Sequence, residues 1–360
     1  MAPILRRAYH SQICAPYAVE PAGIPLQSNL SHRLRFQDLA MTISVSTPHW
    51  DLDASLPPLV LANLSHLGLI KVVGEQGRSF IHGQVTTDIT SLADDQWRWG
   101  AHCDPKGKML ATFRTFAIKD ALFMLMPRDT IAVDLPQLQK YAVFSKATLS
   151  DASDEWTLLG VAGEQAGQFI TEHFGEINQE LTVIEHGAIL KDAERFILML
   201  SPDAASTLVA QSKLSVFDAH AWQALEIAAG YPNLAASHAG QYVPQMCNLQ
   251  AINGISFNKG CYMGQETIAR MKYRGGNKRA LYILRGHTDL QISLESGLEI
   301  ALEDGFRRGG QIIEFVQRGN QVLLTAVLAN DTENETKLRF AGDEHSSLTI
   351  QALPYSLEEA

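Results

Sequence analysis

The chain has 360 residues, of which 46% are hydrophobic and 19% are charged, and its formal net charge is −10. This length and apolar content predict two or three globular domains and exclude a wholly disordered chain. Because the chain is acidic, its overall field does not hold it on nucleic acid, so any contact with RNA requires a local basic patch.

Residues 1–40 differ from the rest of the chain. They contain four arginines against two acidic residues, which fits an organelle transit peptide. However, Met41 stands directly before the first well-patterned segment. We therefore favour an N-terminal extension that is unlike the rest of the chain and precedes a later start at Met41. We expect residues 1–45 to be a disordered extension outside the fold.

Short apolar runs separated by turn signals predict alternating strands and helices after this extension. The first series has strands at 67–73, 97–103, 109–116, 122–126 and 143–149, and helices at 75–82 and 135–141. A similar series follows, with strands at 156–161 and 196–200 and helices at 164–174 and 204–211. Asp218 is then an N-cap for a helix over 219–229, which Gly230 ends.

The two series share a small internal echo. Gly74-Glu75-Gln76 precedes Phe80-Ile81, and Gly163-Glu164-Gln165 precedes Phe169-Ile170 at the same spacing. Both matches fall where a strand passes into a helix, which indicates a duplicated α+β unit, with chance as the alternative. From Arg279 onward, short strands at 280–284, 311–316 and 321–326 indicate a small β-barrel or sandwich.

Four cysteines, Cys14, Cys103, Cys247 and Cys261, are scattered along the chain without a C-x-x-C pair. This pattern predicts neither a disulfide framework nor a structural zinc site, and it favours the reducing cytosol. No apolar run approaches the roughly 20 residues of a membrane span. We therefore expect a cytoplasmic protein without a metal site.

Residues 259–279 form a basic segment with six cations and one acid, or +5, inside a chain of −10. Such a segment attracts anions, whether a polyglutamate tail, a phosphate or an RNA backbone, although a solvated charged face is the plain alternative. Within it, Cys261 follows Lys259 by two residues and precedes an expected helix from Gly264 to Met271. A nearby ammonium and a helix N-terminus both favour a thiolate, whereas most lone cysteines are buried and inert.

The same region carries a family resemblance. Lys259-Gly260-Cys261-Tyr262-Met263-Gly264-Gln265-Glu266, with residues 248–257 before it and 269–281 after it, resembles the signature of the YgfZ family. Residues 83–88, 102–108, 141–146 and 353–359 match as well, so the resemblance covers about residue 50 to the C-terminus. It implies a folate-binding protein related to the aminomethyltransferase of glycine cleavage.

This resemblance implies an α+β fold, with ferredoxin-like units around a central folate channel and a C-terminal β-barrel. We accordingly divide the chain into a first α+β folate-binding unit (46–152), a second unit with the motif segment (153–276) and the barrel (277–360). The implied cofactor is tetrahydrofolate. The implied partners are iron–sulfur enzymes, including those that modify tRNA.

The family's functional residues transfer to individual positions. The motif cysteine and lysine fall on Cys261 and Lys259, and a folate-contacting tryptophan falls on Trp222, which could instead be simply core. A second such tryptophan falls near Leu67, where this chain has none. Arg270 and Arg274, together with Lys272 and Arg279, are candidates for anionic ligand groups or a partner surface.

The chain also departs from the true aminomethyltransferases, which carry an acidic pair where Ala111 and Thr112 stand. Alanine and threonine cannot exchange a proton in the working pH range, so glycine-cleavage activity is not expected. The leading hypothesis is a folate-binding protein that supports iron–sulfur enzymes and tRNA modification. A folate-dependent one-carbon transferase with Cys261 as nucleophile and a direct tRNA binder remain as alternatives.

Overall fold

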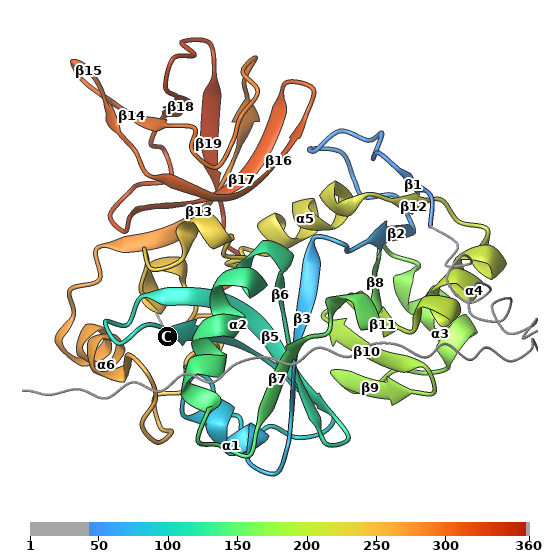
Figure 1. Cartoon of the computed structure of the whole chain (residues 1–360). Coiled ribbons are helices and arrows are strands. Elements are labelled where there is room, and N and C mark those ends of the chain that lie inside the picture. Colours follow the sequence, from blue (N-terminus) through green and yellow to red (C-terminus); the bar gives the residue numbers. More distant parts are fainter. Residues whose placement is uncertain (1–42, 358–360) are drawn as a thin grey trace, which may run out of the picture. The chain divides into compact units, whose positions relative to one another are not determined.

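The computed structural model describes residues 43–357, which lie in one compact unit. The expected extension, residues 1–45, therefore lies almost wholly outside the described residues. Helices and strands alternate along this unit, as the expected α+β class requires (Figure 1).

The first sheet is antiparallel, with five strands in the order β4-β5-β6-β3-β7. The strands are β3 (Leu67–Val73), β4 (Trp97–Cys103), β5 (Met109–Ile118), β6 (Ala121–Pro127) and β7 (Thr148–Asp151). Helices α1 (Gly77–His82) and α2 (Arg128–Ala142) bury apolar side chains against Ile70 and Val72 on one face. The other face presents Leu67 and Leu69, because alternate side chains of a strand point to opposite faces.

The second sheet has seven strands in the order β1-β12-β2-β8-β11-β10-β9. They are β1 (Val45–Ser46), β2 (Val60–Asn63), β8 (Thr157–Ala162), β9 (Leu181–Ile184), β10 (Gly187–Asp192), β11 (Arg195–Leu200) and β12 (Val216–Phe217). A short 3-10 turn, η1 (Ser153–Glu155), precedes β8. Helices α3 (Ala166–Phe174) and α4 (Pro202–Ser212) cover one face through Phe169, Ile170 and Leu208.

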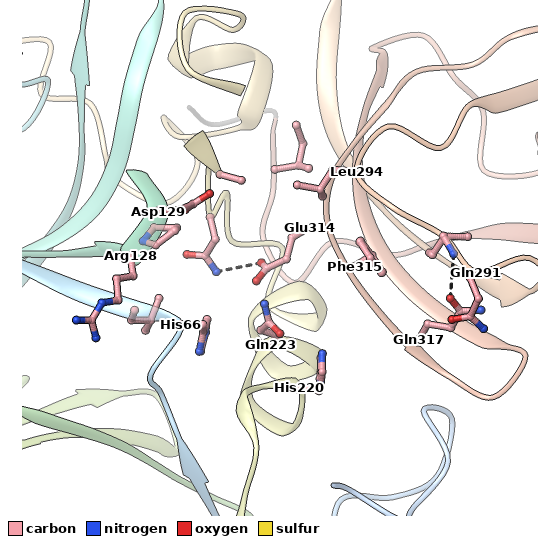
Figure 2. Close-up of a pocket in the computed structure, with 16 residues that line it drawn as sticks. His66, Arg128, Asp129, His220, Gln223, Gln291, Leu294, Glu314, Phe315 and Gln317 are labelled. Carbon is pink, nitrogen blue, oxygen red and sulfur yellow. Dashed lines mark hydrogen bonds between the residues drawn. The ribbon is translucent and has the colours of Figure 1, made fainter. Parts of the chain in front are cut away.

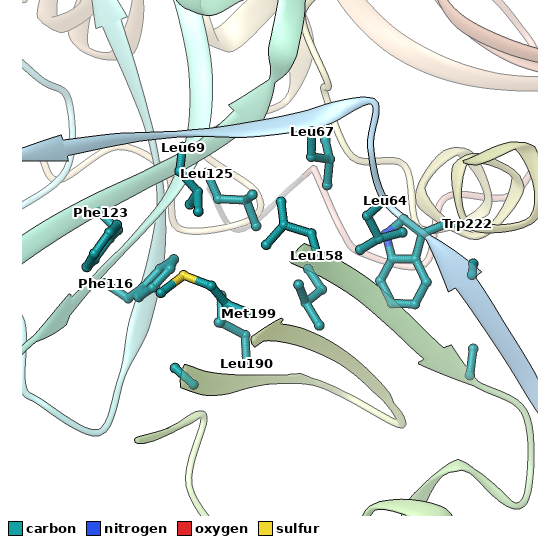
Figure 3. Close-up of a cluster of buried hydrophobic side chains, with 14 of the residues drawn as sticks. Leu64, Leu67, Leu69, Phe116, Phe123, Leu125, Leu158, Leu190, Met199 and Trp222 are labelled. Atoms are coloured by element: carbon teal, nitrogen blue, oxygen red, sulfur yellow. The ribbon is translucent and has the colours of Figure 1, made fainter. Parts of the chain in front are cut away.

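The two sheets share one hydrophobic core on their uncovered faces. Leu67 and Phe123 from the first sheet join Leu158 and Met199 from the second in a single cluster (Figure 3). Strands β2 and β3 lie in different sheets although only three residues separate them, so the chain crosses between the sheets at residues 64–66. This crossing brings His66 and Leu67 to the junction of the two sheets.

The sequence echo corresponds to the same local structure in both units. Gly74 (φ +115°) and Gly163 (φ +104°) each turn the chain from a strand into a helix whose N-cap is a glutamine, Gln76 or Gln165. A Cβ at Gly74 would lie 2.3 Å from the Lys146 carbonyl oxygen, and one at Gly163 would lie 2.4 Å from that of Pro58. Both positions therefore require glycine, and the repeated junction supports a duplicated α+β unit.

Helix α5 (Ala219–Ala228) follows the second sheet, and the Asp218 side chain caps it by accepting from the His220 N–H, as expected. Gly230 ends this helix in a left-handed conformation (φ +66°). A largely irregular segment then contains η2 (Ala236–His238), η3 (Pro244–Cys247) and helix α6 (Gln265–Arg274). This segment holds the motif residues.

The C-terminal sheet has seven strands in the order β15-β14-β18-β19-β13-β17-β16 and its own apolar core. They are β13 (Arg279–His287), β14 (Leu298–Leu302), β15 (Gly305–Arg308), β16 (Gln311–Arg318), β17 (Gln321–Ala329), β18 (Leu338–Phe340) and β19 (Ser347–Gln351). Ile227 of α5 packs against Val316 and Leu323 of this sheet. Helix α5 thus connects the sheet with the rest of the unit.

One expected element is displaced. A strand was predicted over residues 143–149, but α2 continues to Ala142 and β7 begins only at Thr148. The Ser145 N–H bonds back to the Ala142 carbonyl oxygen, and the closed turn leaves Phe144 99% exposed. The apolar residues Val143 and Phe144 therefore mark a surface turn and not a buried strand.

Candidate functional site

Cys261 is the accessible thiol of the described residues. Cys103 and Cys247 are buried, and burial raises the pKa of both thiols, that of Cys247 to about 12. Cys261 is exposed on the loop that precedes α6. Any thiol chemistry in this part of the chain therefore falls to Cys261.

Lys259 fixes this loop to the first α+β unit. Its ammonium donates to the carbonyl oxygens of His82 (2.5 Å), Val85 (2.7 Å) and Thr87 (2.9 Å). An ammonium has three N–H donors, so these carbonyls satisfy the group. Burial lowers the pKa of Lys259 to about 8, although Asp88 acts in the opposite direction. Lys259 thus holds the loop in place, in addition to any effect on Cys261.

Further contacts join the sequence segments that resembled the family. The Thr86 hydroxyl donates to the Gly254 carbonyl oxygen (2.6 Å), and the Ser256 N–H donates to that of Thr86 (2.9 Å). At the start of α6, a Cβ on Gly264 (φ +80°) would lie 2.7 Å from the Gly107 Cα. The motif loop therefore packs tightly against residues 83–88 and the turn at residues 104–107.

A histidine that the sequence analysis missed lies beside the motif loop. His82 Nδ1 lies 3.1 Å from the Asp88 carboxylate, and its Nε2 would lie 4.0 Å from a Cβ on Gly260. Burial and the nearby Lys259 ammonium lower the pKa of His82, which favours the neutral imidazole. Its only sequence signal was its place directly before the matched residues 83–88.

The candidate anion-binding residues lie on and after α6. Arg270, Lys272 and Arg274 are exposed on this helix, which buries Ile268 on its other side. Lys272 and Arg274 occupy the last turn, where the helix dipole favours cations. Arg279 is exposed at the start of β13.

A separate pocket of about 640 Å³ lies where β3, α5 and β16 meet (Figure 2). Leu67 lines it, together with His66, Gln223 and Glu314. Burial, with a smaller effect of the Glu226 carboxylate, raises the pKa of Glu314 to about 8, so this buried side chain is a neutral acid at pH 7. The Asn233 amide donates to it at 3.1 Å.

His66 contributes unsatisfied polar atoms to the same pocket. Its two ring nitrogens are buried and have no hydrogen-bond partner. Burial lowers the pKa of this side chain to about 4, so the imidazole is neutral. Buried polar atoms without partners carry a free-energy cost that a bound ligand can remove.

Trp222 does not line this pocket. Its side chain is fully buried in the core between the two sheets (Figure 3). A Cβ on Gly160 would lie 2.3 Å from the indole ring. Its helix neighbours His220 and Gln223 line the pocket instead. The structure thus brings Leu67 and α5 together at one pocket, while Trp222 lies behind its wall.

Ala111 and Thr112, which stand where the aminomethyltransferases carry an acidic pair, have structural roles. Both Ala111 and Thr112 are buried. The Thr112 hydroxyl donates to the Pro232 carbonyl oxygen (2.5 Å) and accepts from the Leu234 N–H (3.1 Å). Thr112 therefore binds the chain that follows α5 and supplies no titratable group.

A buried ion-pair network was also missed. Glu226 of α5 accepts from Arg114 at 2.7 Å and lies 3.3 Å from Arg195, which also pairs with Asp192 at 2.5 Å. The Arg114 guanidinium lies over the ring of Trp99, at 4.3 Å from its centroid. Burial opposes ionisation of Glu226, but Arg114 and Arg195 hold its pKa below the usual value. These groups join the first sheet, the second sheet and α5.

No group of three or more histidine, cysteine, aspartate or glutamate side chains within residues 43–357 is arranged to hold a metal ion. Across the same residues, no helix is long and apolar enough to cross a membrane.

Two family models match the chain. The "GCVT N-terminal domain" matches residues 57–193, and the "YgfZ, beta-barrel domain" matches residues 277–343. Among solved structures, the glycine cleavage system aminomethyltransferase T from Bartonella henselae aligns with a TM-score of 0.59 at 17% identity, covering 82% of this chain and 86% of that one. The chain therefore has the aminomethyltransferase-like fold with a C-terminal barrel domain, as predicted.

Curated relatives show which family the chain belongs to. The tRNA-modifying protein YgfZ of Photobacterium profundum is 38% identical over 311 residues, which cover 84% of this chain and 94% of that protein. Its counterpart from Pectobacterium carotovorum is 39% identical over 333 residues, or 88% of this chain and all of that protein. The chain belongs to the YgfZ family, which confirms the resemblance.

Proposed function

We propose that this chain is a folate-binding protein that serves tRNA modification, with folate bound in the pocket beside Leu67. The proposal rests on one observation: the fold of a folate-dependent transferase carries a pocket of about 640 Å³ with buried polar groups on an apolar wall. Pockets of this size commonly hold ligands as large as a cofactor. The family relatives carry the name tRNA-modifying protein, which supports the proposed role in tRNA modification.

The residues of the pocket suit a flat heterocycle with a polar edge. Neutral Glu314 and the Gln223 amide, whose side chains interact with each other, offer hydrogen bonds to ring nitrogens, and His66 offers two more unsatisfied atoms. Leu67, Ile313 and Phe315 supply apolar surface for the ring faces. Bound tetrahydrofolate would supply a one-carbon carrier, while these side chains would bind and orient it.

Cys261 acts separately from this pocket in our proposal. None of residues 259–266 lines the pocket, which favours a binding protein over a transferase that uses Cys261 as nucleophile on folate. We propose that the exposed thiol meets an iron–sulfur cluster or a partner enzyme, while Lys259 positions its loop. Arg270 and Arg274 on the adjacent helix attract anionic groups that approach this loop.

Titration of tetrahydrofolate, followed by calorimetry, tests the folate site. We expect Gln223→Leu to weaken binding about tenfold, because one buried hydrogen bond to a ligand contributes about 1.4 kcal/mol. Gln211→Leu, the same substitution in a different pocket near α4, should leave the affinity unchanged. Equal affinity of both variants and the unsubstituted chain would place folate elsewhere.

A genetic test addresses the proposed role in tRNA modification. The chain and its Cys261→Ala variant are expressed in a strain that lacks its family member, and modified tRNA nucleosides are measured by mass spectrometry. We expect the unsubstituted chain to restore the modification and Cys261→Ala to fail at equal protein level. Full restoration by Cys261→Ala would remove the thiol from the proposal.

A further inference from the structure

A second pocket, of about 480 Å³, lies between the C-terminal sheet and the irregular segment at Gln241 and Tyr242. Four cations line it: Lys278 and Arg279 at the start of β13, and Arg307 and Arg308 at the end of β15. No acidic side chain lines it. Four like charges converging on one hollow repel one another, so an anion in the hollow lowers the free energy of the site.

These cations are free for a ligand. Within residues 43–357, none of the four side chains makes an ion pair with a carboxylate. Glu299 stands opposite Arg308 on the neighbouring strand, but its carboxylate accepts from the Arg339 guanidinium at 2.8 Å. The carboxylate opposite Arg308 is therefore already paired.

The pocket also has a fixed frame. The Asn277 amide donates to the Gln245 carbonyl oxygen (3.1 Å), and the Asn330 N–H donates to that of Lys278 (3.1 Å). The Tyr242 side chain lines the hollow, and burial raises its pKa to about 12, so its hydroxyl keeps a proton to donate. Arg279 and Arg308 act in the opposite direction on this hydroxyl, as expected of neighbouring cations.

The positive surface continues beyond the pocket. Arg270, Lys272 and Arg274 are exposed on α6, and the chain runs from Arg274 through two glycines to Lys278. Tyr273 lies among them with 68% of its surface exposed. Aromatic rings between cations stack unpaired bases. A polyanion of carboxylates has no flat ring that could stack on Tyr273.

We propose that the pocket of Lys278, Arg279, Arg307 and Arg308 binds backbone phosphates of single-stranded RNA, whose next nucleotides follow α6 past Tyr273. Guanidinium groups pair with phosphate oxygens through two parallel hydrogen bonds, and three of the four cations are arginines. The net charge of −10 does not prevent this contact, because the pocket concentrates positive charge locally. The inference does not depend on folate binding, since the two pockets share no residue.

Fluorescence anisotropy of a labelled single-stranded RNA of about 12 nucleotides tests the proposal with the whole chain. At about 50 mM salt we expect the double variant R307Q/R308Q to bind at least tenfold more weakly. The slope of log affinity against log salt should also fall by about 1.4, since two phosphate contacts are lost. K140Q/K213Q removes the same charge from exposed helix-end positions on α2 and after α4 and should bind as the unsubstituted chain does.

Three results would overturn the proposal. One is the absence of RNA binding by the unsubstituted chain at low salt. Another is an equal loss of affinity in the two double variants, which would indicate net charge alone. The third is binding of inorganic phosphate or pentaglutamate through Arg307 and Arg308, at matched ionic strength, without binding of RNA. Thermal unfolding of each variant excludes misfolding as the cause.

Discussion

The Lys259 ammonium donates to the His82 carbonyl oxygen at 2.5 Å, across 177 residues of sequence. Two further carbonyls, of Val85 and Thr87, complete its contacts. The loop that exposes Cys261 is therefore held by the first α+β unit and not only by its own helix. Lys259 therefore has a structural role, that of anchoring the motif loop, which is independent of any chemistry of the Cys261 thiol.

Lys259→Met is expected to destabilise the fold by about 3 kcal/mol, because three buried carbonyl oxygens lose a charged donor. Urea unfolding measures this change. Lys337→Met, at an exposed position directly before β18, serves as the control and should change stability by less than about 0.5 kcal/mol. Similar stability of the two variants would show that Lys259 does not anchor the loop.

Gly264→Ala should displace the motif loop. A Cβ there would lie 2.7 Å from the Gly107 Cα and 2.8 Å from the Asp104 carbonyl oxygen, both of them main-chain atoms that cannot rotate away. Gly275, at the other end of α6, has a similar positive φ (+70° against +80°) but no atom within 4 Å of a Cβ. The ψ angles differ, +2° at Gly264 and −168° at Gly275, and only glycine enters the second region readily, so Gly275→Ala carries at least as much backbone strain without the clash. We expect only Gly264→Ala to change the rate at which Cys261 reacts with a thiol reagent.

Glu226→Gln should destabilise the fold strongly. The substitution leaves Arg114 and Arg195 buried around a neutral amide, and removing one partner of a buried ion pair costs about 3–5 kcal/mol. Denaturant unfolding measures the loss. Asp154→Asn removes the partner of Arg128 at the exposed surface and should cost less than about 1 kcal/mol. A loss below about 1 kcal/mol for Glu226→Gln would contradict the structural role of the network.

The sequence predicted local elements well where apolar residues and turn signals coincide. The strands Leu67–Val73 and Trp97–Cys103 have the predicted bounds, and Asp218 caps α5 as predicted. The strands β14, β15 and β18 were missed, because they have only three to five residues and β15 is polar and exposed, so they give little periodic signal. The barrel thus followed from the family resemblance more than from its own pattern.

The site was predicted in part. Cys261 stands exposed and close to a helix start, as its local sequence indicated. The carbonyl contacts of Lys259 and the pocket beside Leu67 depend on residues far apart in the chain, which no local pattern can join. The folate contact of Trp222 stays a prediction, and an alanine variant would test it poorly. Removing a fully buried tryptophan costs about 3–5 kcal/mol of stability.

Glu314 should make stability depend on pH. Its pKa is raised from the ordinary 4.5 to about 8, mainly because the carboxyl group is buried and also because Glu226 lies nearby. Below pH 4.5 the folded and unfolded chains both carry the proton. Between pH 4.5 and 8 only the folded chain keeps it, so the unfolding free energy falls as pH rises, by at most about 1.4 kcal/mol per pH unit.

Glu314→Gln removes this titration while it keeps the shape of the neutral acid. The stability of the variant relative to the unsubstituted chain should therefore rise steadily from pH 5 to pH 8 and then level off, in urea unfolding at each pH. The comparison cancels all other titrating groups, including the neutral His66, whose own effect lies at acid pH. A difference that stays constant over this range would mean that Glu314 is ionised in the folded chain. The pocket would then present a negative charge, and not a neutral donor, to its ligand.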